Sequence, residues 1–234
     1  MPNRNRRHTA ILVILFILAG SALSARSWDI QVEQKLASSQ FSETDKQQIR
    51  QVFEQAEQQQ LPVEMLVLRF EEGLAKRVQV QTLQEALNRE LQAYQETKLI
   101  AAQALGPQVS QQLLADSTIW SKIVTLFQQG VPQPDLIVLL EIYNRQSSKD
   151  KWNNFKYGGG LLMALRQWGL NNEHSLSIVK ALSLSSIPGA DYRAVLEILN
   201  TGISKRISSG DLVQRIVESA PKSRSITMLE RLVR

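Results

Sequence analysis

The sequence predicts an all-α protein, built as an irregular array or bundle of antiparallel helical hairpins. Three observations lead to this class. Apolar residues recur at spacings of three and four along most of residues 42–234, and the period-two alternation of strands is scarce. Glycine and proline stand at the junctions between the apolar stripes. Several junctions also share one order of residues, so we expect degenerate helix-turn-helix units with short connections.

Residues 1–25 have the layout of a secretory signal peptide. Arginines precede an apolar run over 10–19, and small residues follow over 20–25. The run is shorter than the ~20 residues that cross a bilayer as a helix. We therefore expect cleavage near Ala22 to Ala25 and export, so that the protein is periplasmic or extracellular. The alternative is an uncleaved segment that anchors the protein in the inner membrane.

Residues 26–41 are predicted to form a flexible linker, and 42–234 a helical domain. The clearest helix is 82–105, where Leu83, Leu87 and Leu91 begin one apolar stripe. This helix ends before a Gly-Pro pair, because proline cannot continue a helical ladder. The expected helices are 43–59, 63–77, 82–105, 108–115, 118–129, 135–145, 160–168, 175–184, 189–200 or 189–206, 211–219 and 225–233.

Two junctions are close copies: EEGLAKRV at 71–78 and TGISKRI at 201–207. The apolar period continues through Gly73 and Gly202, so we expect both glycines inside helices, where they let another helix approach closely. The Lys-Arg pair after each glycine would then lie at the helix end, where cations oppose the helix dipole. The alternative is an anion site used twice, which requires both copies on one surface.

Polar residues before apolar stripes predict helix starts, because their oxygen atoms accept hydrogen bonds from free backbone N–H groups. The expected N-caps are Thr82, Asp135, Ser175 and Asp211.

Composition excludes several kinds of site. The chain has no cysteine, hence no disulfide, thiolate metal site or lipid-modified N-terminus. His174 is the only histidine after the signal segment, which leaves no two-histidine metal site and no cofactor motif. Three of the 27 Lys plus Arg lie in the signal segment, so 24 remain against 22 Asp plus Glu. This small excess predicts no nucleic-acid partner. No segment after the signal is long enough to span a membrane.

Residues 146–160 show no helical stripe and are predicted to be irregular, with Gly158 to Gly160 as a flexible hinge. Aromatic side chains alternate here with lysines, a combination that can stack on sugars or bases and hold a phosphate or carboxylate. The alternative is that the aromatics fill the core and the lysines remain in water. The candidate partner-binding residues are Lys149, Lys151, Trp152, Phe155, Lys156 and Tyr157.

Carboxylates offer the remaining route to catalysis, because a glycan hydrolase can work with two acids. Glu141 interrupts an apolar run and Glu72 follows another acid. The structural interpretation of Glu141 is a surface residue that pairs with Arg145 four positions on.

Three hypotheses follow. The leading one is an exported non-enzymatic helical protein that binds a partner in the cell envelope or outside the cell, where the partner is a protein or an envelope polymer. The second is an envelope hydrolase that acts on a glycan through paired carboxylates. The third is a binder of anionic lipid or polymer. Its candidate cations are Lys76, Arg77, Lys205, Arg206, Arg224, Arg231 and Arg234.

Overall fold

The computed structural model describes residues 27–234, and within this range the chain is all-helical, which confirms the predicted class. The signal peptide predicted over 1–25 lies outside the described residues. The α-helices are α2 (Ser27–Ser38), α3 (Glu43–Gln58), α4 (Val63–Ala75), α5 (Val80–Leu105), α6 (Pro107–Ala115), α7 (Ser117–Gln128), α8 (Gln133–Asn144), α9 (Lys151–Trp168), α10 (Asn172–Ser183), α11 (Val195–Ser204), α12 (Ser209–Ser219) and α13 (Ile226–Val233). Two short 3-10 helices are η1 (Gly189–Ala194) and η2 (Ala220–Lys222).

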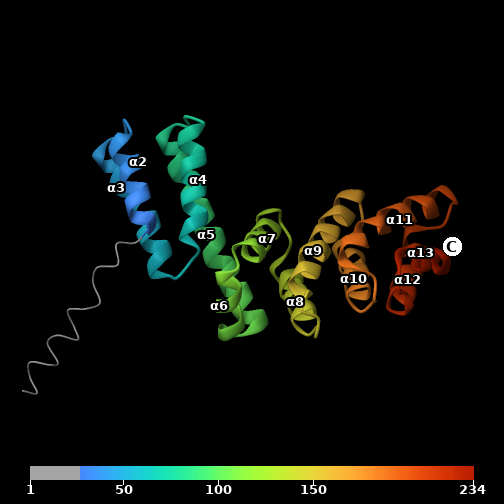
Figure 1. Ribbon diagram of the computed structural model, residues 1–234. Helices are drawn as coiled ribbons and strands as arrows, with labels where there is room; N and C mark the ends of the chain where they lie inside the picture. The colour runs from blue at the N-terminus through green and yellow to red at the C-terminus, as the bar shows by residue number, and fades with distance from the viewer. Residues whose placement is uncertain (1–26) are drawn as a thin grey trace, which may run out of the picture.

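The helices form an elongated row in which neighbours along the chain are neighbours in space (Figure 1). The long helix α5 contacts α3 and α4 as well as α7 and α8, so it joins the first hairpins to the middle of the row. Further along, α9 packs against α7, α8, α10 and η1. Buried apolar side chains form one continuous core. Within residues 27–234, none of the helices has the length and apolar character that a membrane crossing requires.

One tight turn recurs at the ends of α3, α4, α7, α9 and α11. One residue of each turn has a positive φ, and the apolar residue after it donates its backbone N–H to the carbonyl five residues earlier. This Schellman arrangement satisfies carbonyl groups left free at a helix end. The next residue is already the N-cap of the following helix, so the chain reverses within a few residues. The turn pairs are Gln60–Leu61, Arg77–Val78, Gly130–Val131, Gly169–Leu170 and Arg206–Ile207.

The predicted N-caps are wrong, because the residue directly after the apolar turn residue is already the N-cap of the new helix. The expected caps Thr82, Asp135, Ser175 and Asp211 lie inside the helices, and the observed caps are Gln79, Pro132, Asn171 and Ser208. Two of the observed caps use side-chain oxygens. Asn171 accepts from the backbone N–H of His174 at 2.8 Å, and Ser208 accepts from that of Asp211 at 3.1 Å.

Gly73 and Gly202 lie inside helices and touch the following helix, as predicted. A Cβ atom at Gly73 would lie 2.5 Å from Leu83 Cδ1, and one at Gly202 would overlap the Leu212 side chain. Each glycine carbonyl also accepts the N–H of the apolar turn residue, at 3.0 and 3.1 Å. The close approach of successive helices therefore explains why both positions lack a side chain.

The two Lys-Arg pairs lie at helix ends, as expected, but beyond the last helical residue. Lys76 and Lys205 are the C-caps of α4 and α11. Arg77 and Arg206 have φ angles of 51° and 63°, in the left-handed region. This conformation costs a non-glycine residue about 1–2 kcal/mol, so the turn geometry outweighs local preference.

Helix α2 replaces most of the flexible linker predicted over 26–41. Val32 and Leu36 are fully buried, and the Trp28 ring stacks on Phe53 with a centroid distance of 5.6 Å. The linker prediction is wrong because three apolar residues at a spacing of four are enough to dock a short helix when α3 and α4 cover them. The glutamines between them remain on the solvent side.

Helix α9 occupies most of the segment 146–160, in place of the predicted irregular chain. Glycine inside a helix costs about 1 kcal/mol relative to alanine. Here that cost is offset by close packing. A Cβ atom at Gly158 would overlap the Tyr143 hydroxyl, and one at Gly159 would lie 2.7 Å from Leu126 Cδ1. These glycines let α9 approach α8 and α7, so the flexible-hinge interpretation is wrong.

Candidate functional site

Three of the predicted binding residues attach the first turn of α9 to the rest of the fold. Phe155 is fully buried, and its ring meets Tyr143 and Trp152 edge-on at centroid distances of 5.9 and 6.1 Å. Lys151 Nζ donates to the carbonyl and the side-chain oxygen of Asn144 at 3.2 and 3.1 Å. It also lies 5.3 Å from the centre of the half-buried Trp152 ring. These contacts are structural, and they fix where α9 begins.

The other predicted residues point away from the core. Lys149 is exposed in the turn before α9, while Lys156 is half-buried and Tyr157 is 48% exposed. Successive helical residues are turned by about 100°, so Tyr157 lies on the face of α9 opposite Phe155. That face carries two hollows, and Tyr157 lines both.

The first hollow, called here the polar hollow, has a volume of about 700 Å³ and lies between the start of α9 and the chain that connects α10 to η1. Its walls carry hydroxyl and carboxamide groups. The side chains of Asn153, Asn154 and Tyr157 make no hydrogen bond with another residue in 27–234 and are available to a ligand. Its polar lining residues are Gln146, Ser147, Ser148, Asp150, Asn153, Asn154, Tyr157, Ser183, Ser185, Ser186 and Tyr192.

The second hollow, called here the cationic hollow, has a volume of about 460 Å³. Three helices each contribute one cation to its wall: Lys122 from α7, Lys156 from α9 and Arg193 from η1. Within the described chain, no carboxylate lines this hollow and none of the three cations takes part in an ion pair. Lys122 and Lys156 are half-buried. Arg193 is exposed. Three cations around a hollow whose lining contains no carboxylate can attract an anion.

Residues of η1 join the two hollows, because Gly189 and Ala190 line both. A Cβ atom at Gly189 would lie 2.7 Å from Asn154 Oδ1 and 2.8 Å from Tyr157 Cδ2, so η1 rests directly on α9. Tyr192 anchors the same segment, since its buried hydroxyl donates to the carbonyl of Leu182 at 3.1 Å. Burial raises the pKa of Tyr192 to about 12. Arg193 is therefore presented from a fixed backbone.

The acids proposed for hydrolysis are held in surface ion pairs. Glu141 accepts from Arg145 at 3.1 Å, four residues on, and both side chains are exposed; this confirms the structural interpretation of Glu141. Glu72 accepts from Lys76 and Arg69, whose hydrogen bonds lower its pKa. Neither acid lines the polar or the cationic hollow.

The linings of the two hollows contain one acidic group. Asp150, at the polar end, is the only carboxylate in either lining. Among residues 27–234 there is no cluster of three or more side chains of the types that ligate metals.

The two Lys-Arg copies do not share a surface. The first copy ends α4 and the second ends α11, and Figure 1 places these helices in opposite halves of the row. Lys76 is in addition paired with Glu72. The anion site that would use both copies is therefore not formed within one molecule.

Sequence reasoning selected Lys156 and Tyr157 but missed Lys122 and Arg193. The missed cations lie more than thirty residues from Lys156 on either side, and no local pattern links the three. Only the packing of α7 and η1 on α9 brings them to one hollow. No protein-family model, no curated protein and no solved structure matches this chain.

Proposed function

We propose that the chain is an exported, non-enzymatic helical protein that binds a partner in the cell envelope or outside the cell. The observation that carries this proposal is the pair of joined hollows on α9 and η1. There, three cations that have no carboxylate partner among residues 27–234 lie beside free carboxamide and hydroxyl groups. Export is supported by the sequence of residues 1–25, with its arginines, its apolar run and its small residues.

The helical row is a suitable scaffold for such binding. Repeated hairpins stack side by side and create extended surfaces that such proteins use for binding. Here the hollows are built on one long helix, α9, whose position is fixed by glycine contacts with α7 and α8. Rigid walls reduce the ordering cost of binding.

No observation favours the hydrolase alternative. Glycoside hydrolysis needs two carboxylates that face one cleft. The polar hollow contains the single acid Asp150, and the cationic hollow contains none. Glu141 and Glu72 take part in ion pairs along their own helices.

The binding proposal is tested with two variants of equal charge. The first variant removes the three cations of the cationic hollow through Lys122→Gln, Lys156→Gln and Arg193→Gln, and is called here the groove variant. The paired-cation variant carries Lys35→Gln, Arg69→Gln and Lys76→Gln, which removes three cations that are ion-paired with Glu71 or Glu72. Each immobilised protein is exposed to envelope extract and to culture medium from the source cells. We expect a partner that is retained by the wild type and the paired-cation variant and lost by the groove variant.

Export is measured separately, by fractionation and by sequencing the N-terminus of the mature protein. A new N-terminus directly after Ala22 to Ala25 would agree with the proposal. Cytoplasmic residence with the first residue retained would contradict export. Equal capture by all three proteins would contradict the assignment of the binding surface.

A further inference from the structure

We propose that the joined hollows bind an extended acidic peptide segment of a protein partner, with carboxylates in the cationic hollow and peptide backbone along the polar hollow. This inference rests on the proposed binding function and specifies its ligand. It is argued from the charge, the hydrogen-bonding groups and the position of the two hollows.

The charge distribution favours an anion at one end only. Lys122, Lys156 and Arg193 surround the cationic hollow and have no carboxylate partner in the described chain. At the opposite end, the wall of the polar hollow contains Asp150. A ligand that is acidic along its whole length would be attracted at one end and repelled at the other. The favoured ligand therefore has its acidic residues grouped at the end that lies near η1 and α7.

The polar hollow is matched to a peptide backbone. A carboxamide side chain carries both donors and an acceptor, and an extended peptide presents N–H and C=O groups in turn. Asn153 is exposed and Asn154 half-buried, and neither side chain is engaged by another residue in 27–234. Ser186, on the facing connection, is exposed and lines the same hollow. The hydroxyl of its neighbour Ser185 already donates to the carbonyl of Leu182.

The cations are poorly placed for a membrane surface and only partly suited to a glycan. Lys122 and Lys156 are half-buried in the wall of a hollow, so a flat surface would not reach them easily. An acidic glycan would supply carboxylates, but its rings stack on exposed aromatic faces. Tyr157 is the only aromatic residue of the two linings that is exposed. A peptide can use the asparagines without stacking, and it is the ligand that the lining favours.

The test measures binding of three fluorescent probes to the purified protein. The first is acetyl-Ser-Gly-Ser-Glu-Glu-Glu-amide, the second has the three glutamates replaced by glutamines, and the third is a galacturonate hexamer, which has carboxylates but no peptide backbone. We expect the glutamate peptide to bind most tightly. The groove variant should weaken its binding by about tenfold or more, and the paired-cation variant should change it by less than about twofold.

Two single substitutions separate this arrangement from general charge attraction. Asn153→Ala, at an exposed position, should weaken the glutamate peptide several-fold without changing galacturonate binding. Asp150→Asn should leave the glutamate peptide unchanged or tighten it by about two- to fivefold, because it removes repulsion at the far end. A circular dichroism melt of every variant checks that each is folded before its binding is compared.

Three results would overturn the inference. Galacturonate could bind more tightly than the glutamate peptide, which would assign the hollows to an acidic glycan. The groove variant and the paired-cation variant could lose binding equally, which would show non-specific electrostatic attraction. The glutamate peptide could also fail to bind while the groove variant still loses a partner from extract. In that last case the ligand class is wrong and the proposed binding function is retained.

Discussion

The first hairpins and the cationic hollow on α9 both contain several cations, but they use them differently. Four cations in α2, α3 and α4, together with Lys76 at the C-cap of α4, each have a carboxylate partner. Around the cationic hollow, three cations have none within the described chain. The number of basic residues therefore does not distinguish the two regions, whereas the distribution of carboxylates does. The paired residues are Lys35–Glu71, Lys46–Glu43, Arg50–Glu33, Arg69–Glu72 and Lys76–Glu72.

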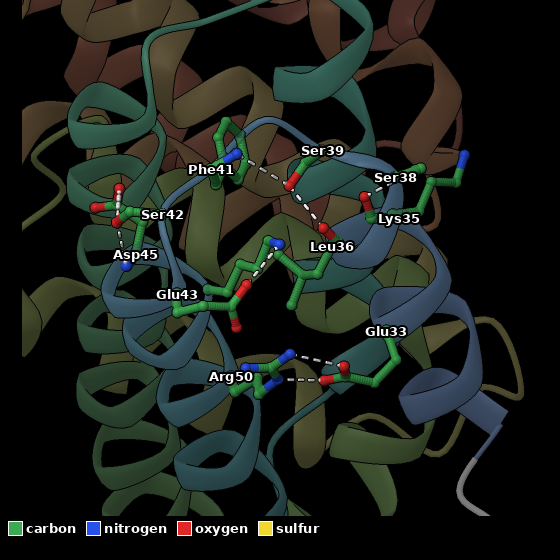
Figure 2. Close-up of polar contacts among 11 residues, drawn as sticks. Glu33, Lys35, Leu36, Ser38, Ser39, Phe41, Ser42, Glu43, Asp45 and Arg50 are labelled. Carbon is green, nitrogen blue, oxygen red and sulfur yellow. Dashed lines mark hydrogen bonds and ion pairs between the residues drawn. The ribbon is translucent and has the colours of Figure 1, made fainter.

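Figure 2 shows how the pairing serves the fold in the first hairpin. Arg50 on α3 reaches across to Glu33 on α2 and donates two hydrogen bonds, of 2.5 and 2.9 Å. Lys46 donates to Glu43 at 2.8 Å, within the first turn of α3. These cations are already satisfied by neighbours, so their removal should affect stability slightly and ligand binding not at all.

The comparison of the two regions requires that α2 packs against the rest of the fold. The largest effect on stability should come from its buried side chains. Leu36→Ala removes a fully buried side chain and should lower the free energy of unfolding by about 2–5 kcal/mol. Leu68→Ala, at a position 66% exposed, should have little effect. Chemical denaturation measures both. If Leu36→Ala is as stable as the wild type, α2 is not packed as described.

The hollows depend on the segment η1, which Tyr192 anchors. Tyr192 should make the free energy of unfolding depend on pH in the alkaline range. Burial holds the pKa of Tyr192 near 12, above the value of about 10 in an unfolded chain. The unfolded state then loses its proton first. Stability from this group is fully present below pH 10 and is lost as the pH rises toward 12, by about 2–3 kcal/mol.

Tyr192→Phe tests this pH dependence. The variant loses the hydrogen bond to Leu182 and should be less stable at neutral pH by about 1 kcal/mol. Its free energy of unfolding should then fall less steeply than that of the wild type between pH 10 and pH 12. Identical slopes for the two proteins would mean that Tyr192 does not contribute the alkaline loss.

Alanine substitutions at two nearby glycines of α9 should change the stability of the protein in opposite directions. Gly158→Ala places a methyl group on the Tyr143 ring and should destabilise by about 1–3 kcal/mol through overpacking. Gly160→Ala meets nothing within 4 Å and should stabilise by about 0.5–1 kcal/mol, because alanine is the better helix former. Thermal unfolding of the two variants distinguishes close packing from a hinge, since a hinge would respond alike at both positions.

The smallest effect should come from the paired cations themselves. Arg50→Gln breaks the ion pair with Glu33. The side chains of Arg50 and Glu33 are 28% and 41% exposed, so the substitution should lower the free energy of unfolding by no more than about 1 kcal/mol. The hydrogen bond from Arg50 lowers the pKa of Glu33. This contribution is therefore present above the unfolded pKa of Glu33 and is lost as the pH falls through its lowered folded pKa. Over that pH range, the free energy of unfolding of the Arg50→Gln variant should fall less than that of the wild type as the pH decreases.

Much of the fold could be predicted from local patterns, and the exceptions have physical causes. Strong stripes such as 82–105 predicted helix α5 to within two residues at its start. The prediction for residues 146–160 was wrong because glycines that allow close packing look like loop residues when their contacts, Tyr143 and Leu126, are unknown. The left-handed Arg77 was missed because the turn geometry outweighs the preference of arginine.

The candidate site was less predictable than the fold. Lys156 and Tyr157 stood out by local composition, but Phe155 and Trp152 had the same appearance and lie in or against the core. Helical rotation separates them, and that rotation is visible only when the segment is known to be helical. The contributions of α7 and η1 depend entirely on tertiary packing.

The most direct measurement is a nuclear magnetic resonance titration of the labelled protein with the glutamate peptide. We expect concentration-dependent shifts in the backbone amides of Lys156, Tyr157 and Ala190, and unchanged amides at Arg69 and Lys76. This pattern would show that a ligand selects the unpaired cations and ignores the paired ones. Shifts of similar size in both regions would contradict the claim that carboxylate pairing separates structural cations from binding cations.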